Sequence, residues 1–183
     1  MSAKISVISI SLALVSLLLF SCSEGGWEEV YRVFERPFSA EVRVENADGA
    51  YAATVALAQI GSGEDTAAAS ARNGNIVYTS PDSLSDISAV RSQGKVRVNV
   101  SGIEIVPSPN IAARYTFLLD LLDVRADEIT DHGSEELDGT RMLTLAFLYD
   151  DSEYILYIDA ENNMPLRIEG ADMRITFDRF IYT

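Results

Sequence analysis

The sequence predicts a mainly β (α+β) domain, a strongly curled antiparallel half-barrel of about ten strands covered by two helices. Three observations predict this class. Many short segments alternate between apolar and polar side chains, as half-buried strands do. Turn signals such as Asp-Gly and Asn-Gly separate these segments so closely that consecutive strands must run antiparallel. Two other segments carry apolar residues at helical spacing.

Length, composition and charge fit one folded domain and exclude some functions. The chain has 183 residues, of which 48% are hydrophobic and 9% aromatic, which is enough to fill one core. The net charge of -14 argues against a nucleic-acid partner, because phosphate binding needs clustered Lys and Arg side chains. The single cysteine cannot form an internal disulfide bond.

Residues 1–21 are predicted to be a signal peptide of the lipoprotein type. Lys4 supplies the positive start, and residues 5–20 carry no charge. As a helix this uncharged run spans about 24 Å, which is short of the ~30 Å hydrocarbon core of a bilayer. It therefore fits the apolar region of a signal peptide better than a membrane-spanning helix.

The end of this run, "LFSC", resembles the bacterial lipobox. Leu19 and Ser21 match the motif, whereas Phe20 is bulkier than its usual second residue. The resemblance implies cleavage before Cys22 and attachment of diacylglycerol and acyl chains such as palmitate. Residues 22–26 would then be a lipidated tether at the extracytoplasmic face of a bacterial cell membrane. Ordinary cleavage one residue after the cysteine is the alternative.

Residues 27–183 are predicted to form a single domain that begins with a helix. Trp27, Val30, Tyr31 and Phe34 share one face of that helix, and Pro37 ends it. A second helix is predicted over residues 108–123. It starts with Ser108 as N-cap and Pro109 as first helical residue, and its apolar face consists of Ile111, Tyr115, Leu118, Leu119 and Leu122.

The remaining segments with alternating or apolar patterns are predicted strands. Those strands are residues 38–46, 51–60, 76–80, 86–92, 95–100, 103–108, 127–137, 140–150, 153–160, 165–170 and 173–182. The central strands 140–150 and 153–160 carry apolar side chains on both faces. The helices can cover one face, so the other needs a cover, a partner or a ligand, unless the sheet closes on itself.

The order of elements, with "TSPDSLSDI" before the second helix and "ID…NMPLRIE" near the end, resembles the LolA/LolB-like superfamily. Within that superfamily it resembles small lipoproteins related to the germination lipoprotein GerS. The resemblance implies a LolA-like half-barrel with an apolar cavity that shelters acyl chains or, in the GerS branch, a role in binding a partner protein. No functional residue carries over from the carriers, and Arg43 is expected to be an ordinary strand arginine.

Residues suited to catalysis or metal binding are few. His132 is the single histidine and is expected to lie on the surface, because zinc sites need several His or Cys ligands. The acidic groups at 150–153 and 135–138 are expected to be solvated hairpin ends. Neither a phosphate-binding loop nor a nucleophile motif occurs in the sequence, so no enzymatic activity, cofactor or metal is expected beyond a lipid on Cys22.

Three functions follow as hypotheses. The first is a lipid-anchored, non-enzymatic binding module that holds an acyl chain, another lipoprotein or a hydrophobic ligand. The second is a structural or regulatory lipoprotein of the envelope or spore that binds a partner and fills its cavity with its own side chains. The third is a surface hydrolase with paired carboxylates, at least one of them buried. In the first, the predicted cavity lining is Val42, Val44, Val55, Leu57, Val98, Leu145, Phe147 and Leu156.

Overall fold

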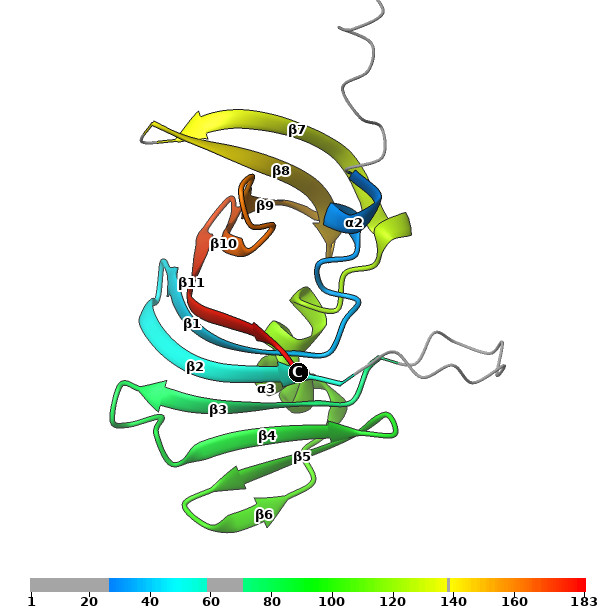
Figure 1. Cartoon of the computed structure of the whole chain (residues 1–183). Helices are drawn as coiled ribbons and strands as arrows, with labels where there is room; N and C mark the ends of the chain where they lie inside the picture. The colour runs from blue at the N-terminus through cyan, green and yellow to red at the C-terminus, as the bar shows by residue number, and fades with distance from the viewer. Residues whose placement is uncertain (1–26, 59–70, 138) are drawn as a thin grey trace, which may run out of the picture. The chain divides into compact units, whose positions relative to one another are not determined.

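A computed structural model describes residues 27–58, 71–137 and 139–183 of the chain (Figure 1). The chain divides into two compact units, Met1–Val30 and Tyr31–Thr183. The predicted signal peptide 1–21, Cys22 and the tether 22–26 lie outside the described residues.

The described residues form eleven strands, two α-helices and a short 3₁₀ helix. The helices are α2 (Trp27–Tyr31), α3 (Pro109–Leu121) and η2 (Ala126–Glu128). The strands are β1 (Phe38–Asn46), β2 (Gly49–Leu57), β3 (Gly74–Ser80), β4 (Ile87–Ser92), β5 (Lys95–Val100), β6 (Ile103–Ile105), β7 (Ile129–Leu137), β8 (Thr140–Tyr149), β9 (Ser152–Asp159), β10 (Pro165–Gly170) and β11 (Met173–Tyr182).

All eleven described strands belong to one antiparallel sheet, whose order is β6-β5-β4-β3-β2-β1-β11-β10-β9-β8-β7. Each strand pairs with its neighbour in sequence, except that β6 and β7 form the two edges and β1 pairs with β11. The first and last strands therefore join two meanders at the middle of the sheet. The sheet curves strongly along this order (Figure 1), as large twisted sheets do. The predicted fold class, a mainly β curled antiparallel sheet with two helices, is confirmed.

The sheet has an apolar inner face and a largely polar outer face. On β1, Phe38, Val42 and Val44 are buried, whereas Glu41 and Arg43 are exposed. This is the period-two alternation expected of a strand with one solvated face. Exposed ion pairs cross the outer face, including Arg43–Asp178 at 3.0 Å. The prediction that Arg43 is an ordinary strand arginine agrees with this position.

Charged, aromatic and apolar side chains lie on the outer face of β8, β9 and β10. Tyr157 is 8% exposed, and the Arg167 guanidinium lies 4.5 Å from the centre of its ring. Met142 is also buried, but Leu148 is 58% exposed. The outer face is therefore partly covered by a cation–π contact and partly open to solvent.

Helix α3 packs on the inner face of β2, β3, β4 and β5. Gly74 allows this close approach, since a Cβ built on it would lie 2.7 Å from the Ala56 carbonyl oxygen and 3.1 Å from Leu119 Cδ2. The predicted apolar face of the helix is wrong at Ile111, which is 49% exposed. Ile111 lies in the first turn of α3, whereas the buried leucines lie in its second half.

The first predicted helix differs in length from the observed one. Helix α2 ends at Tyr31, whereas the sequence predicts that this helix continues to residue 36. After Tyr31 the chain continues in turns, with the Glu35 N–H donating to the Arg32 carbonyl at 3.0 Å. Pro37 disfavours helical geometry at the residue before it, and the ring of Phe34 packs against Phe38 at 5.5 Å. Tertiary packing therefore overrides the helical pattern here.

A buried ion cluster fixes the second half of α3 to the sheet. Arg72, just before β3, and Arg91, on β4, are each 4% exposed. Asp123 accepts from the Arg72 backbone N–H at 2.9 Å and pairs with Arg72 Nε at 2.8 Å and Arg91 Nη2 at 3.3 Å. Arg91 also pairs with Asp120. Burial lowers the pKa of the Arg72 guanidinium, and the Asp123 carboxylate opposes that shift.

The substitution Asp123→Ala should lower the free energy of unfolding by about 3–5 kcal/mol, because it leaves two buried guanidinium groups without their shared carboxylate. Asp178→Ala is the matched control. It removes the carboxylate of an ion pair whose side chains are 54% and 41% exposed, and should cost no more than about 1 kcal/mol. Urea unfolding of the full chain measures both. Equal losses would show that the cluster does not hold α3.

Candidate functional site

The candidate site is the apolar inner face of the sheet. Register partners on neighbouring antiparallel strands point to the same side, so the pairing identifies which residues share this face. One such row crosses six strands through Leu145, Leu156, Ile168, Ile175, Val44 and Tyr51. A second row crosses four strands through Val55, Ile76, Ala89 and Val98. The inner face is therefore continuous from β8 to β5.

The structure places all eight predicted lining residues on this inner face, as the register shows. They are Val42, Val44, Val55, Leu57, Val98, Leu145, Phe147 and Leu156, and none is more than 2% exposed. In this conformation their side chains pack against other protein atoms instead of facing open space. Whether they line a ligand cavity stays a prediction.

Aromatic rings fill the inner face near the start of β1. The Phe34 ring lies 5.5 Å from that of Phe38 and 6.0 Å from that of Phe177. Phe38 also stacks on Phe180 at 4.8 Å. Phe34 and Phe38 are no more than 2% exposed. This aromatic packing closes that end of the inner face.

Aromatic side chains gather toward the other end of β1, on both sides of α3, and all of them except the buried Tyr78 are partly exposed. We define the aromatic rim as Tyr51, Tyr78, Tyr115, Phe117, Tyr149 and Tyr154. On one side of the helix, the Tyr51 and Tyr78 rings lie 5.7 Å apart, and the Tyr78 hydroxyl donates to the Tyr115 carbonyl oxygen at 3.5 Å. On the other side, Phe117 of α3 lies 5.6 Å from Tyr149 of β8. The helix thus carries aromatic contacts in both directions.

Tyr154 of the rim packs closely against the sheet. It stacks on Phe147 at 5.9 Å, and its register partner on β10 is Gly170. A Cβ on Gly170 would lie 2.5 Å from Cε1 of Tyr154, so the ring lies directly over the glycine. Met173 and Asn46 continue the same row toward the β1–β2 turn.

Four rim hydroxyl groups, those of Tyr51, Tyr78, Tyr149 and Tyr154, are neutral hydrogen-bond donors at physiological pH. Burial raises the pKa of Tyr78 to about 12, and burial followed by the Asp120 carboxylate raises the pKa of Tyr149 to about 12. Burial also raises the pKa of Tyr51 and of Tyr154. A rim of rings with neutral polar tips above an apolar interior suits an amphiphilic ligand.

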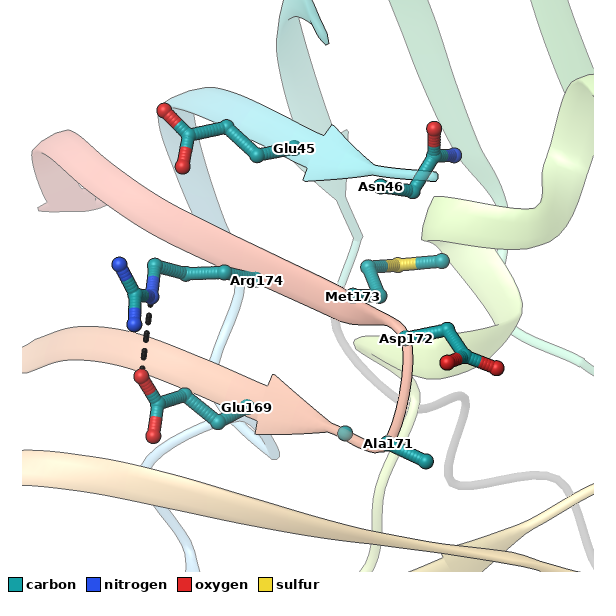
Figure 2. A pocket seen from close by; sticks show the side chains of 8 residues that line it. Glu45, Asn46, Glu169, Ala171, Asp172, Met173 and Arg174 are labelled. Carbon is teal, nitrogen blue, oxygen red and sulfur yellow. Dashed lines mark hydrogen bonds and ion pairs between the residues drawn. The ribbon is translucent and has the colours of Figure 1, made fainter. Parts of the chain in front are cut away.

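A separate surface hollow of about 400 Å³ lies at the turn ends of β1, β10 and β11. Figure 2 shows Arg174 and Glu169 pointing toward one another there, and their ion pair is 2.9 Å long. Arg167 also pairs with Glu169, at 3.2 Å. Glu45 and Asp172 add further carboxylates to the lining. The hollow is therefore polar and differs in chemistry from the inner face.

The remaining sequence candidates occupy the surface. His132 on β7 is exposed, and its Nδ1 lies 2.8 Å from the Tyr31 hydroxyl. The described acidic residues of the 150–153 and 135–138 groups are exposed hairpin ends, whereas Asp138 lies outside the described residues. Among the described residues, no group of three or more His, Cys, Asp or Glu side chains could hold a metal ion.

Sequence reasoning missed the residues of the buried ion cluster. Arg91 occupies an inner-face position of β4, in phase with buried Ala89, where the pattern suggests core packing. Asp120 and Asp123 are spaced three apart, and in the sequence they look like ordinary polar residues of the second helix. Their carboxylates are engaged by Arg91 and Arg72, so they do not form the available carboxylate pair that a hydrolase would need.

No helix within the described residues is long and apolar enough to cross a membrane. No family model matches the sequence, and no curated protein matches it. Solved structures do match. An uncharacterized conserved protein from Thermus thermophilus is 15% identical with a TM-score of 0.51, and the match covers 86% of this chain and 85% of that one.

Two further solved structures are similar to this chain. MucB, whose complex with MucA is known from Pseudomonas aeruginosa, is 14% identical with a TM-score of 0.49, and the match covers 85% of this chain and 57% of the MucB chain. A LolA superfamily protein from Nitrosomonas europaea is 12% identical with a TM-score of 0.38, over 85% of this chain and 93% of that one. At these identities the likeness concerns the fold alone.

Proposed function

We propose that this chain is an extracytoplasmic, lipid-anchored, non-enzymatic binding module that holds an acyl chain, or the acyl chains of another lipoprotein, against the inner face of its sheet. The observation that carries the proposal is the continuous apolar inner face from β8 to β5. Helix α3 packs on the part of this face that β2 to β5 form. The aromatic rim borders the part of the face that α3 does not cover.

The energetics favour an acyl ligand. Each CH₂ group transferred from water to an apolar site contributes about 0.8 kcal/mol. The neutral hydroxyl groups of the rim can donate hydrogen bonds to the ester oxygens of such a ligand, which have no protons of their own. Entry requires rim side chains to swing outward, since the inner-face residues are packed in the described conformation.

A second candidate function is partner binding by a domain with a self-filled core. The specific observation in its favour is that none of the eight predicted lining residues is more than 2% exposed. MucB, a fold neighbour, has been solved in complex with MucA, and a protein partner is the analogous proposal here. Membership of the GerS branch remains a prediction from the sequence resemblance.

The anchor is proposed from the sequence motif around Cys22. In that proposal the signal peptide 1–21 is removed, Cys22 carries diacylglycerol and further acyl chains, and residues 22–26 tether the domain. Two or three acyl chains hold a protein at a membrane firmly, whereas one does so only marginally. The domain would then be held at the extracytoplasmic face of a bacterial cell membrane.

Tyr154→Ala should reduce the non-covalently bound lipid that copurifies with the full chain, because it removes a ring at the border of the inner face. Tyr157→Ala is the matched control, since Tyr157 is on the same strand but its side chain lies on the outer face. Lipid extraction and mass spectrometry measure the lipid retained per chain. Absence of bound lipid in the unaltered chain and both variants would support the self-filled core instead.

Cys22→Ala should prevent acylation, so that the chain is either released from the membrane fraction or retained as uncleaved precursor. Membrane fractionation with intact-mass measurement distinguishes these results from normal processing. A mature form of ordinary size that stays in the membrane fraction would contradict the anchor without bearing on the inner face.

A further inference from the structure

The hairpin turns at one end of the sheet are acidic. Alternate turns of an antiparallel meander lie at the same end, and the pairing of Asn46 with Met173 joins the two meanders there. The connections at this end are residues 47–48, 81–86, 101–102, 150–151 and 171–172. They contain neither Lys nor Arg, although the whole chain has 14 such residues. They contain six aspartates, all exposed: Asp48, Asp82, Asp86, Asp150, Asp151 and Asp172.

Neighbouring cations do not neutralise these six carboxylates. Within the described residues, none of the six forms an ion pair. Arg174, near the start of β11, pairs with Glu169 at 2.9 Å. Arg91 is buried and pairs with Asp120 and Asp123. Arg114 of α3 is exposed and adds one positive charge, so the negative charge prevails at this end of the sheet.

The aromatic rim lies at the same end. Tyr149 and Tyr154 stand on either side of the 150–151 turn, and the Tyr149 ring lies 5.6 Å from that of Phe117 and 6.3 Å from that of Tyr154, edge to face in both pairs. Tyr154 packs over Gly170, which precedes the 171–172 turn. These three rings are partly exposed. Exposed ring faces beside carboxylates attract cations, including quaternary ammonium groups.

The carboxylates act on the hydroxyl groups of these rings. Burial, followed by the carboxylates of Asp120 and Asp150, raises the pKa of Tyr149, and the Arg91 guanidinium opposes this shift. Burial, followed by the carboxylates of Asp150 and Asp172, raises the pKa of Tyr154. Since a negative charge at these hydroxyls is disfavoured, an anionic head group that accepts their hydrogen bonds would meet the same repulsion.

We propose that the acidic end of the sheet selects the head group of the acyl ligand, so that a cationic head group, such as an amine or a quaternary ammonium, is favoured over a carboxylate or a phosphate. The selection rests on the proposed function, because it concerns a ligand whose acyl chain lies on the inner face. Apolar contacts supply most of the affinity, and the charge at the rim discriminates between head groups.

Three amphiphiles with the same acyl chain test this: palmitoylcholine is cationic, monopalmitoylglycerol is neutral and palmitate is anionic. Each competes with a neutral diazirine-labelled acyl ester for photo-crosslinking to the inner face of the full chain in a neutral detergent. Palmitoylcholine should compete at least about tenfold more strongly than palmitate, with the glycerol ester between them. Added salt should narrow this difference, because the carboxylates are exposed.

The double substitution Asp150→Asn and Asp172→Asn should reduce the preference for palmitoylcholine over palmitate about threefold or more, because it removes two charges that act on the rim hydroxyls. Asparagine tolerates the left-handed backbone at Asp150, whose φ is 49°. The matched control is Glu104→Gln with Asp178→Asn. It changes the net charge equally, but at carboxylates that pair with Arg97 and Arg43, and should keep the preference.

Equal competition by the three amphiphiles, or stronger competition by palmitate, would overturn the head-group selection. An equal loss of preference in the control variant would also overturn it, because the effect would then come from the net charge of the whole chain. Failure of the diazirine ester to label the inner face contradicts the proposed acyl site itself. Labelling without a preference between head groups contradicts the selection alone.

Discussion

The buried ion cluster between α3 and the sheet is the interaction on which the arrangement of the inner face depends. A curled sheet with one apolar face needs a cover, and a single helix of thirteen residues can cover only part of it. The position of α3 determines which part of the apolar face is covered. Asp120 lies in the last turn of α3 and Asp123 just after the helix, and Arg91 and Arg72 hold them over β3 and β4. Gly74 then lets the helix approach the strands closely.

This placement gives the inner face two different ends. Near the start of β1, rings such as Phe34 and Phe38 close the interior completely. Toward the other end of β1, the aromatic rim is partly exposed except at Tyr78, and its five tyrosines carry hydroxyl groups. The same sheet therefore combines a fully packed part with a border that is more exposed to solvent. In a ligand-binding domain the side chains at that border would swing outward to admit the ligand, whereas in a domain with a self-filled core they would stay in place.

The strands were predictable because their side chains alternate with period two. β1 is an example, and its predicted bounds match those in the structure. The pairing of β1 with β11 was not predictable, because it joins segments far apart in sequence and neither strand pattern names its neighbour. The ion cluster was missed for a similar reason. Arg91 and Asp123 each look like ordinary polar residues until the fold buries both together.

Other differences come from competition between local pattern and tertiary packing. Phe34 fits the spacing of a helix that continues past Tyr31, but the ring packs into the aromatic cluster instead. Ile111 fits the apolar face of α3, yet it is exposed in the first turn of that helix. The eight predicted lining residues were found from alternation and all lie on one face. Alternation alone does not indicate whether a face encloses a ligand or its own side chains.

Photo-crosslinking with an acyl ester that carries a diazirine within its hydrocarbon chain tests most directly whether the inner face holds an acyl chain. The full chain in nanodiscs is irradiated with this probe, and the modified peptides are mapped by mass spectrometry. An acyl site on the inner face predicts modification of inner-face residues such as Val44 and Leu156. Modification confined to exposed outer-face residues such as Leu148, or none at all, would contradict an acyl site on the inner face.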